Sequence, residues 1–200
     1  NTPINFIVSD LNDQTILTAK NMLEIDFKKC GFSISDKTTK RKYMIIAGTV
    51  NDKLIQKIIK ERKIDIRKIK DKWEHFLISS FTKLEGKSQN GILIIGSDAR
   101  GTAYGLMEIS RMLGVSPWHW WADVPVKPCS AFYINPTQSI IDGPKIKYRG
   151  IFINDEAPAL SNWSKEKFGG FNHLFYEKVF ELMLRLKANY IWPAMWGNAF

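Results

Sequence analysis

Two acidic residues follow a short apolar segment in the last third of the chain. Residues 148–153 are rich in aromatic and β-branched side chains, which favours a β-strand. Three polar residues come directly after it, namely Asn154, Asp155 and Glu156. Carboxylates in such a place can donate or accept protons in catalysis. Because neighbours on a strand point to opposite faces, we expect one acid to face a substrate and the other to support the loop, and we favour Asp155 over Glu156 as the catalytic one.

These residues also have structural alternatives, which the sequence leaves open. Asn154 can bind a sugar hydroxyl or cap the backbone of its own loop. Glu156 can serve a site or form an ion pair with a basic neighbour. The available neighbours are Arg149, Lys165 and Lys167.

A second strand is predicted where residues 190–196 end in tryptophan, after an amphipathic helix within residues 172–187. Strand, helix and strand in this order form one unit of a (β/α)₈ barrel, whose sites lie at the C-terminal ends of its strands. We therefore expect Trp196 to stack on a ring of the substrate and Trp192 to lie in the core. Asn198 is a candidate donor to a carboxylate or hydroxyl.

Length and composition suggest one complete domain and part of another. The 200 residues are 44% hydrophobic, enough for one full core of roughly 100 to 150 residues with a remainder. We expect residues 1–114 to be a small N-terminal α/β domain, 115–145 a connector rich in Trp and Pro, and 146–200 the start of the barrel. A barrel has eight strands, so we expect the rest of the catalytic chain to be required for activity.

Strands and helices alternate along residues 1–114. The periodicity predicts strands at 4–8, 43–47, 74–84 and 91–96, with a turn at 89–91. Helices are predicted from a cap at Asn12 or Asp13 to Cys30, after a cap at Asn51, and over 102–113.

The turn at residues 96–101 offers two interpretations. Backbone N–H groups before a helix can hold an anion, and Arg100 could pair with a carboxylate of a ligand. Alternatively, Ser97 or Asp98 only caps the helix. The segment lacks the spacing of a nucleotide-binding loop, and we expect no cofactor. No cluster of metal ligands is visible in the sequence.

The charge and the cysteines exclude several classes of protein. The net charge is +9, and residues 53–72 hold nine Lys or Arg against three acids. Isoleucines rather than aromatic residues interleave with them, which favours a solvated helix face over a nucleic-acid site. No apolar run approaches the roughly 20 residues of a membrane span. Cys30 and Cys129 make neither a disulfide framework nor a zinc site, and we expect two buried thiols.

Trp118, Trp120 and Trp121 lie in the proline-bounded connector. Such bulky side chains are expected to pack at a domain interface, with sugar stacking as the alternative.

Several motifs in order resemble glycoside hydrolase family 115, the xylan α-1,2-glucuronidases. They lie within residues 91–200 and read SPWHWWADVP at 116–125, YRGIFINDE at 148–156, FGGFN at 168–172 and LRLKANYIWPAMW at 184–196. The resemblance implies inverting hydrolysis of the α-1,2 bond that joins glucuronic acid, or its 4-O-methyl ether, to xylan. Inversion needs an acid and a base roughly 6.5 to 9.5 Å apart, and the resemblance places the general acid beyond Phe200.

The partner implied is thus a xylan-type polysaccharide bearing glucuronic acid, and the location implied is secreted or periplasmic. The alternative from another class is a non-catalytic carbohydrate-binding or domain-interaction module. Such a module would need a closed fold within the 200 residues.

Overall fold

The structure is a computed structural model that describes residues 3–8, 13–35, 43–84, 87–135 and 139–193. The chain divides into two compact units, Asn1–Lys145 and Ile146–Phe200. Residues 115–145, expected to be a separate connector, group with the first unit. Across the described ranges, no helix has the length and apolar character needed to cross a membrane.

A five-stranded sheet forms the centre of the first unit. Its strands are β1 (Ile4–Val8), β2 (Tyr43–Thr49), β3 (Phe76–Leu84), β4 (Lys87–Gly96) and β5 (Ile140–Asp142). They lie in the order β1-β2-β4-β3-β5. The first three in that order are parallel, and β3 runs antiparallel to both of its neighbours. The predicted α/β class is confirmed.

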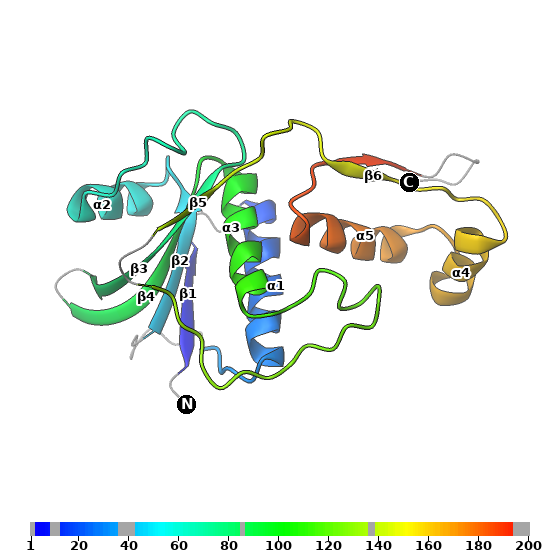
Figure 1. Cartoon of the computed structure of the whole chain (residues 1–200), viewed down its shortest axis with the longest axis horizontal. Coiled ribbons are helices and arrows are strands. Elements are labelled where there is room, and N and C mark those ends of the chain that lie inside the picture. The colour runs from blue at the N-terminus through cyan, green and yellow to red at the C-terminus, as the bar shows by residue number, and fades with distance from the viewer. Residues whose placement is uncertain (1–2, 9–12, 36–42, 85–86, 136–138, 194–200) are drawn as a thin grey trace. The chain divides into compact units, whose positions relative to one another are not determined.

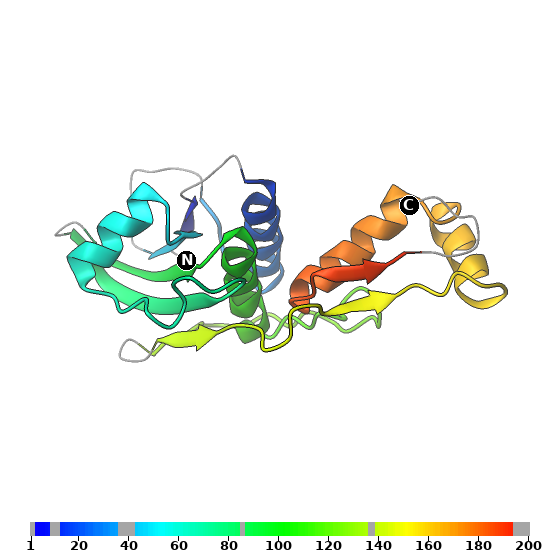
Figure 2. The ribbon, with the colours of Figure 1, turned by 90° about the horizontal axis from the view of Figure 1, so that it is seen from above.

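Helices cover both faces of this sheet. α1 (Gln14–Lys29) and α3 (Ala99–Met112) pack together on one face, and α2 (Lys53–Arg62) lies on the other, as Figure 1 and Figure 2 show. Parallel strands covered on both faces need apolar side chains at successive positions, and residues 44–47 of β2 are all buried.

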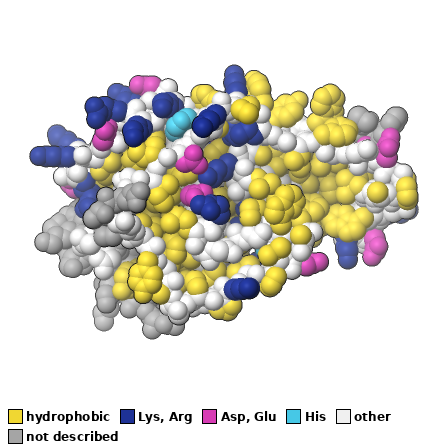
Figure 3. Space-filling model, in the orientation of Figure 1, with side chains coloured by type: hydrophobic (Ala, Val, Ile, Leu, Met, Phe, Trp, Pro, Cys, Tyr) yellow, Lys and Arg dark blue, Asp and Glu magenta, His cyan; other side chains and the backbone are white. Residues whose placement is uncertain are grey.

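The first half of the basic segment 53–72 forms the helix α2, and the residues from Ile64 on are turn and loop. Ile55 and Ile58 of α2 are buried in a cluster with Met44 and Ile46 of β2. Lys and Arg side chains gather on the outer surface over this part of the unit (Figure 3). The isoleucines therefore serve packing, and the lysines keep the outer face in water.

Short polar side chains fix the helix ends, with two differences from expectation. Asp13 caps α1, where its Oδ1 accepts the N–H groups of Thr15 and Ile16 at 2.9 and 3.1 Å. The residue at the N-cap of α2 is Asp52 rather than Asn51. α3 begins at Ala99, three residues earlier than predicted, because Asp98 caps it.

The turn predicted at residues 89–91 is wrong, because these residues lie inside β4. Gly91 pairs with Met44 of β2, and a Cβ added to it would lie 2.3 Å from the ring of Phe81. The glycine thus permits a close approach between neighbours on the sheet and does not form a turn.

The second unit holds a parallel β-α-β arrangement. Its elements are β6 (Gly150–Phe152), α4 (Ala159–Phe168), α5 (His173–Arg185) and β7 (Tyr190–Trp192). β6 and β7 pair in parallel, with Ile151 opposite Ile191. The helix predicted within 172–187 is confirmed as α5. α4 was not predicted, because only Ser164 of its ten residues is buried and the helix lacks a clear apolar stripe.

Candidate functional site at the ends of the paired strands

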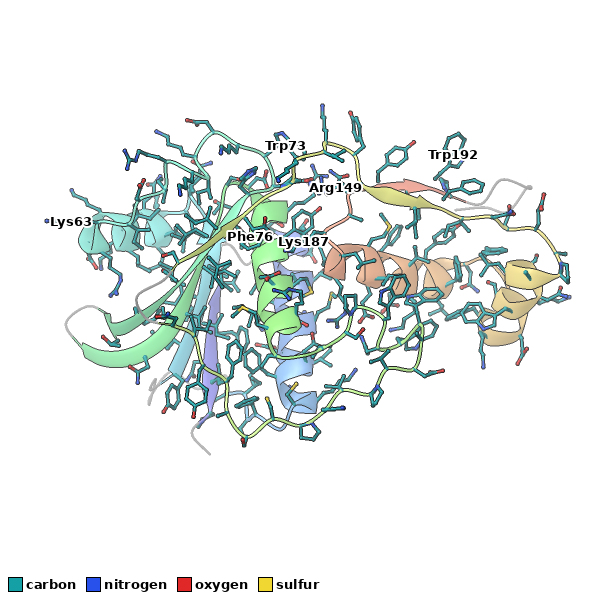
Figure 4. The ribbon with its side chains drawn as sticks, viewed as in Figure 1. Lys63, Trp73, Phe76, Arg149, Lys187 and Trp192 are labelled. Carbon is teal, nitrogen blue, oxygen red and sulfur yellow. The ribbon has the colours of Figure 1, made fainter. Side chains whose placement is uncertain are left out.

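Arg149 and Asn189 join the two strands where they begin. The Arg149 N–H donates to Asn189 Oδ1 at 3.0 Å, and the Arg149 carbonyl accepts from the N–H groups of Asn189 and Tyr190. Arg149 Nε donates to the Lys187 carbonyl at 2.9 Å, and Figure 4 shows these two residues side by side. The guanidinium is therefore engaged at the strand end opposite to Glu156.

Gly150 is required at this junction. A Cβ there would lie 1.8 Å from the carbonyl oxygen of Tyr190, so no larger residue fits while the strands are paired. Sequence reasoning missed this role of the Arg149–Gly150 pair. The signal available was a glycine inside a strand, which often marks close backbone approach.

The candidate acids lie at the opposite, carboxyl-terminal ends of the strands. The Ile153 N–H donates to the carbonyl of Trp192 at 2.9 Å, which extends the pairing one residue past β6. Asn154 Oδ1 then accepts the N–H of Glu156 at 3.1 Å. Asn154 therefore caps its own loop, which is the structural alternative that the sequence left open.

Burial alternates along this segment and distinguishes the two acids. Ile153 and Asp155 are buried, at 6% and 2% exposure, whereas Phe152, Asn154 and Glu156 are exposed. The two acids thus differ in environment, as expected from their spacing. The sequence favoured Asp155 as the acid that faces a substrate. In the structure the exposed acid is Glu156, and Asp155 lies on the buried side with Ile153.

The exposed side of the strand pair is aromatic. Tyr148 packs edge-on against Tyr190, and Phe152 against Trp192, with ring centroids 6.0 and 5.9 Å apart. Trp192 is 56% exposed and points away from α5 (Figure 4), so the described residues alone do not place it in a core. Trp196 and Asn198 lie outside the described residues.

Arg100 belongs to the first unit and forms an ion pair there. Its Nε lies 2.9 Å from Oε1 of Glu74, whose side chain is fully buried. Asp98 accepts the N–H groups of Gly101 and Glu74, both at 2.7 Å. The Gly101 N–H in the first turn of α3 is thus engaged by the protein's own carboxylate, which favours helix capping over anion binding.

The three tryptophans of residues 118–121 differ in exposure. Trp120 and Trp121 are half-buried and meet edge to face, with centroids 4.9 Å apart. Trp118 is 46% exposed, and its backbone N–H donates to Ser116 Oγ. Within the described ranges, no group of three or more His, Cys, Asp or Glu side chains could hold a metal ion.

Comparisons with known proteins place this fold among the glycoside hydrolases. The chain is similar to the solved structure of a family 115 4-O-methyl-α-glucuronidase with specificity for decorated arabinogalactans. The two are 34% identical over 96% of this chain, with a TM-score of 0.80. A second is a family 138 enzyme that targets the pectin rhamnogalacturonan II, 18% identical over 94% of this chain with a TM-score of 0.55, which shows a shared fold alone. No curated protein matches the chain.

The family model for glycosyl hydrolase family 115 matches residues 142–200, which contain β6, α4, α5 and β7. With the 34% identity to a family member along nearly the whole chain, this shows that the chain belongs to glycoside hydrolase family 115. The chain spans 25% of the length of that family member and 18% of the family 138 enzyme.

Proposed function

We propose that this chain is the amino-terminal part of an α-glucuronidase, which hydrolyses the bond between glucuronic acid, or its 4-O-methyl ether, and a polysaccharide. The observation that carries the proposal is the 34% identity, at a TM-score of 0.80, to a 4-O-methyl-α-glucuronidase. In this account, β6 and β7 are the first two strands of a (β/α)₈ barrel that further chain completes.

The exposed aromatic face of the strand pair supports the proposal that β6 and β7 belong to a barrel. Tyr148, Phe152, Tyr190 and Trp192 are each between 48% and 64% exposed, although large aromatic side chains favour burial. In a barrel the face of each strand opposite its helix lies in the interior, where side chains are packed. Further strands would cover these rings and close the open edges of the pair.

The loop after β6 supports a role for the acids. It lies at the carboxyl-terminal end of a strand, where barrel enzymes place their sites. Glu156 and Asn154 are exposed there, and we assign Glu156 to contact with substrate. Asp155, which is buried, holds the loop in place. The partner of Glu156 in acid–base catalysis lies in the remaining chain, because inversion needs two carboxyl groups on opposite sides of the sugar.

Two polymers could supply the substrate, since each can bear the same terminal uronic acid. The sequence resemblance points to glucuronoxylan, and the related structure is of an enzyme specific for decorated arabinogalactans. A polymer of this size is reached outside the cytoplasm, which supports a secreted or periplasmic location. The full-length enzyme should be given each polymer separately while uronic acid release is measured. Release from neither one would contradict the proposed activity.

A further inference from the structure

The two cysteines of the chain meet, although they are roughly 100 residues apart in sequence. Cys30 is the C-cap residue of α1 and is fully buried, and Cys129 is half-buried in the segment that follows α3. The N–H of Cys129 donates to the carbonyl of Cys30 at 3.0 Å. Both are free thiols in the structure.

The backbone contact brings the two residues within reach of a covalent link. Their main chains are joined by a hydrogen bond, and disulfides need Cα atoms no more than roughly 6.8 Å apart. The Cys129 side chain also lies near the Cys30 thiol, since it is one of the groups that raise the pKa of that thiol. We propose that Cys30 and Cys129 form an intramolecular disulfide when the protein meets a disulfide oxidant such as glutathione disulfide.

The reaction proceeds by two exchanges. The thiolate of Cys129, the more accessible of the two, attacks glutathione disulfide, forms a mixed disulfide and releases one glutathione thiolate. The thiolate of Cys30 then displaces the second glutathione. Two protein thiols lose two electrons and two protons in all, and the oxidant becomes two glutathione thiols. Burial and the neighbouring Cys129 raise the pKa of the Cys30 thiol to about 11, which makes Cys30 the slower nucleophile.

The bond would fasten a weakly held segment to the first unit. Residues 123–135 contain no helix or strand, and they contact α1 through the Cys129 hydrogen bond and through Phe132, whose ring lies 6.0 Å from that of Phe27. β5, which follows, contributes only three residues to the sheet edge. A link between Cys30 and Cys129 closes a long loop, and long loops give the largest restriction of the unfolded chain.

The test is oxidation of the purified 200-residue chain with glutathione disulfide, compared with a sample kept in dithiothreitol. We expect free thiols to fall from two per chain to none, the mass to fall by two hydrogen atoms, and digestion to yield one peptide pair joined through Cys30 and Cys129. The melting temperature of the oxidised chain should be higher by roughly 5 to 15 °C.

A control keeps two cysteines but moves one of them. In the double variant Cys129→Ser, Ser130→Cys, the thiol is displaced by one position onto an exposed residue, and it should not bond to Cys30. The single variant Cys129→Ser should fold, and its melting temperature should not rise on treatment with glutathione disulfide. Three results would each overturn the proposal. The two thiols could stay free, the reaction could stop at the glutathione adduct, or the disulfide could form between two chains. None of these outcomes depends on the α-glucuronidase assignment.

Discussion

At the scale of single residues, the environment of each acid determines what it can do. Asp155 is 2% exposed at the end of β6, and a carboxylate this buried is satisfied by the surrounding protein. Glu156 is exposed one residue further on. Adjacent positions in the sequence thus carry the same functional group in two settings, one suited to holding the loop and the other to meeting a substrate.

Amide substitutions distinguish these roles. In the full-length enzyme, Glu156→Gln should lower kcat/KM at least about a hundredfold, because the amide cannot exchange a proton, with melting nearly unchanged. Asp155→Asn should instead lower stability by about 1–3 kcal/mol, because a buried acceptor is replaced by a donor. Kinetics and thermal unfolding of both variants would check this. The assignment is reversed if Asp155→Asn melts normally and is inactive while Glu156→Gln turns over normally.

Arg100 forms an ion pair with Glu74, and removing the Arg100 side chain should lower the stability of the first unit. Arg100→Leu leaves the buried Glu74 carboxylate without its guanidinium, which should cost about 1–3 kcal/mol in the urea unfolding of the first unit. The matched control is Arg67→Leu, since Arg67 pairs with Asp65 at the surface, where an ion pair contributes little. Unchanged stability of Arg100→Leu, with weakened substrate binding in the full-length enzyme, would favour the uronate contact instead.

At the scale of elements, an ion network ties the middle of α5 to its end. Glu181 accepts from Arg185 Nε at 3.2 Å and from Lys178 Nζ at 3.2 Å, and the Arg185 side chain is only 4% exposed. Burial acts to raise the pKa of Glu181, but Arg185 and Lys178 outweigh it and hold the pKa below its ordinary value. The charged form is therefore favoured in the folded state.

The sign of the resulting pH dependence follows from linkage. A lowered pKa in the folded state stabilises α5 above the unfolded pKa of about 4.3, and this contribution is lost as pH falls through the folded pKa. Glu181→Gln should thus speed amide hydrogen exchange in α5 near pH 7, and its difference from the wild type should shrink as the pH falls below about 4.3. Glu177→Gln, at an exposed position of the same helix, is the control. Equal protection in both variants near pH 7 would contradict a stabilising network.

Much of the architecture was predictable, and the failures have physical causes. Strands β1 to β4 and the helix α5 carry strong apolar periodicity, so their existence follows from the sequence. α4 lacks that signal, and β5 is three residues long, so tertiary contacts decide both. In the candidate site, Asn154 and the two acids could be found from their place after a strand. Which acid is buried depends on packing against the rest of the unit, which spacing alone does not determine.

At the scale of the whole molecule, the chain spans 25% of the length of the related family 115 enzyme. We expect the isolated 200 residues to release no uronic acid from either polymer, because two paired strands leave the acid–base pair incomplete. Incubation of the purified chain with each polymer, followed by chromatography of the products, would measure this. Turnover by the isolated chain, in a preparation shown to be free of host hydrolase, would mean that both catalytic groups lie within these residues.

The stereochemistry of the product tests the proposed activity most directly. The full-length enzyme should be mixed with the polymer it prefers, and the anomeric proton of the first uronic acid released should be followed by NMR before mutarotation. An inverting enzyme acting on an α-linked glucuronic acid produces the β-anomer first. Early appearance of the β-anomer is the predicted result. Initial release of the α-anomer would contradict inversion, and the absence of any uronic acid product would contradict the assignment as an α-glucuronidase.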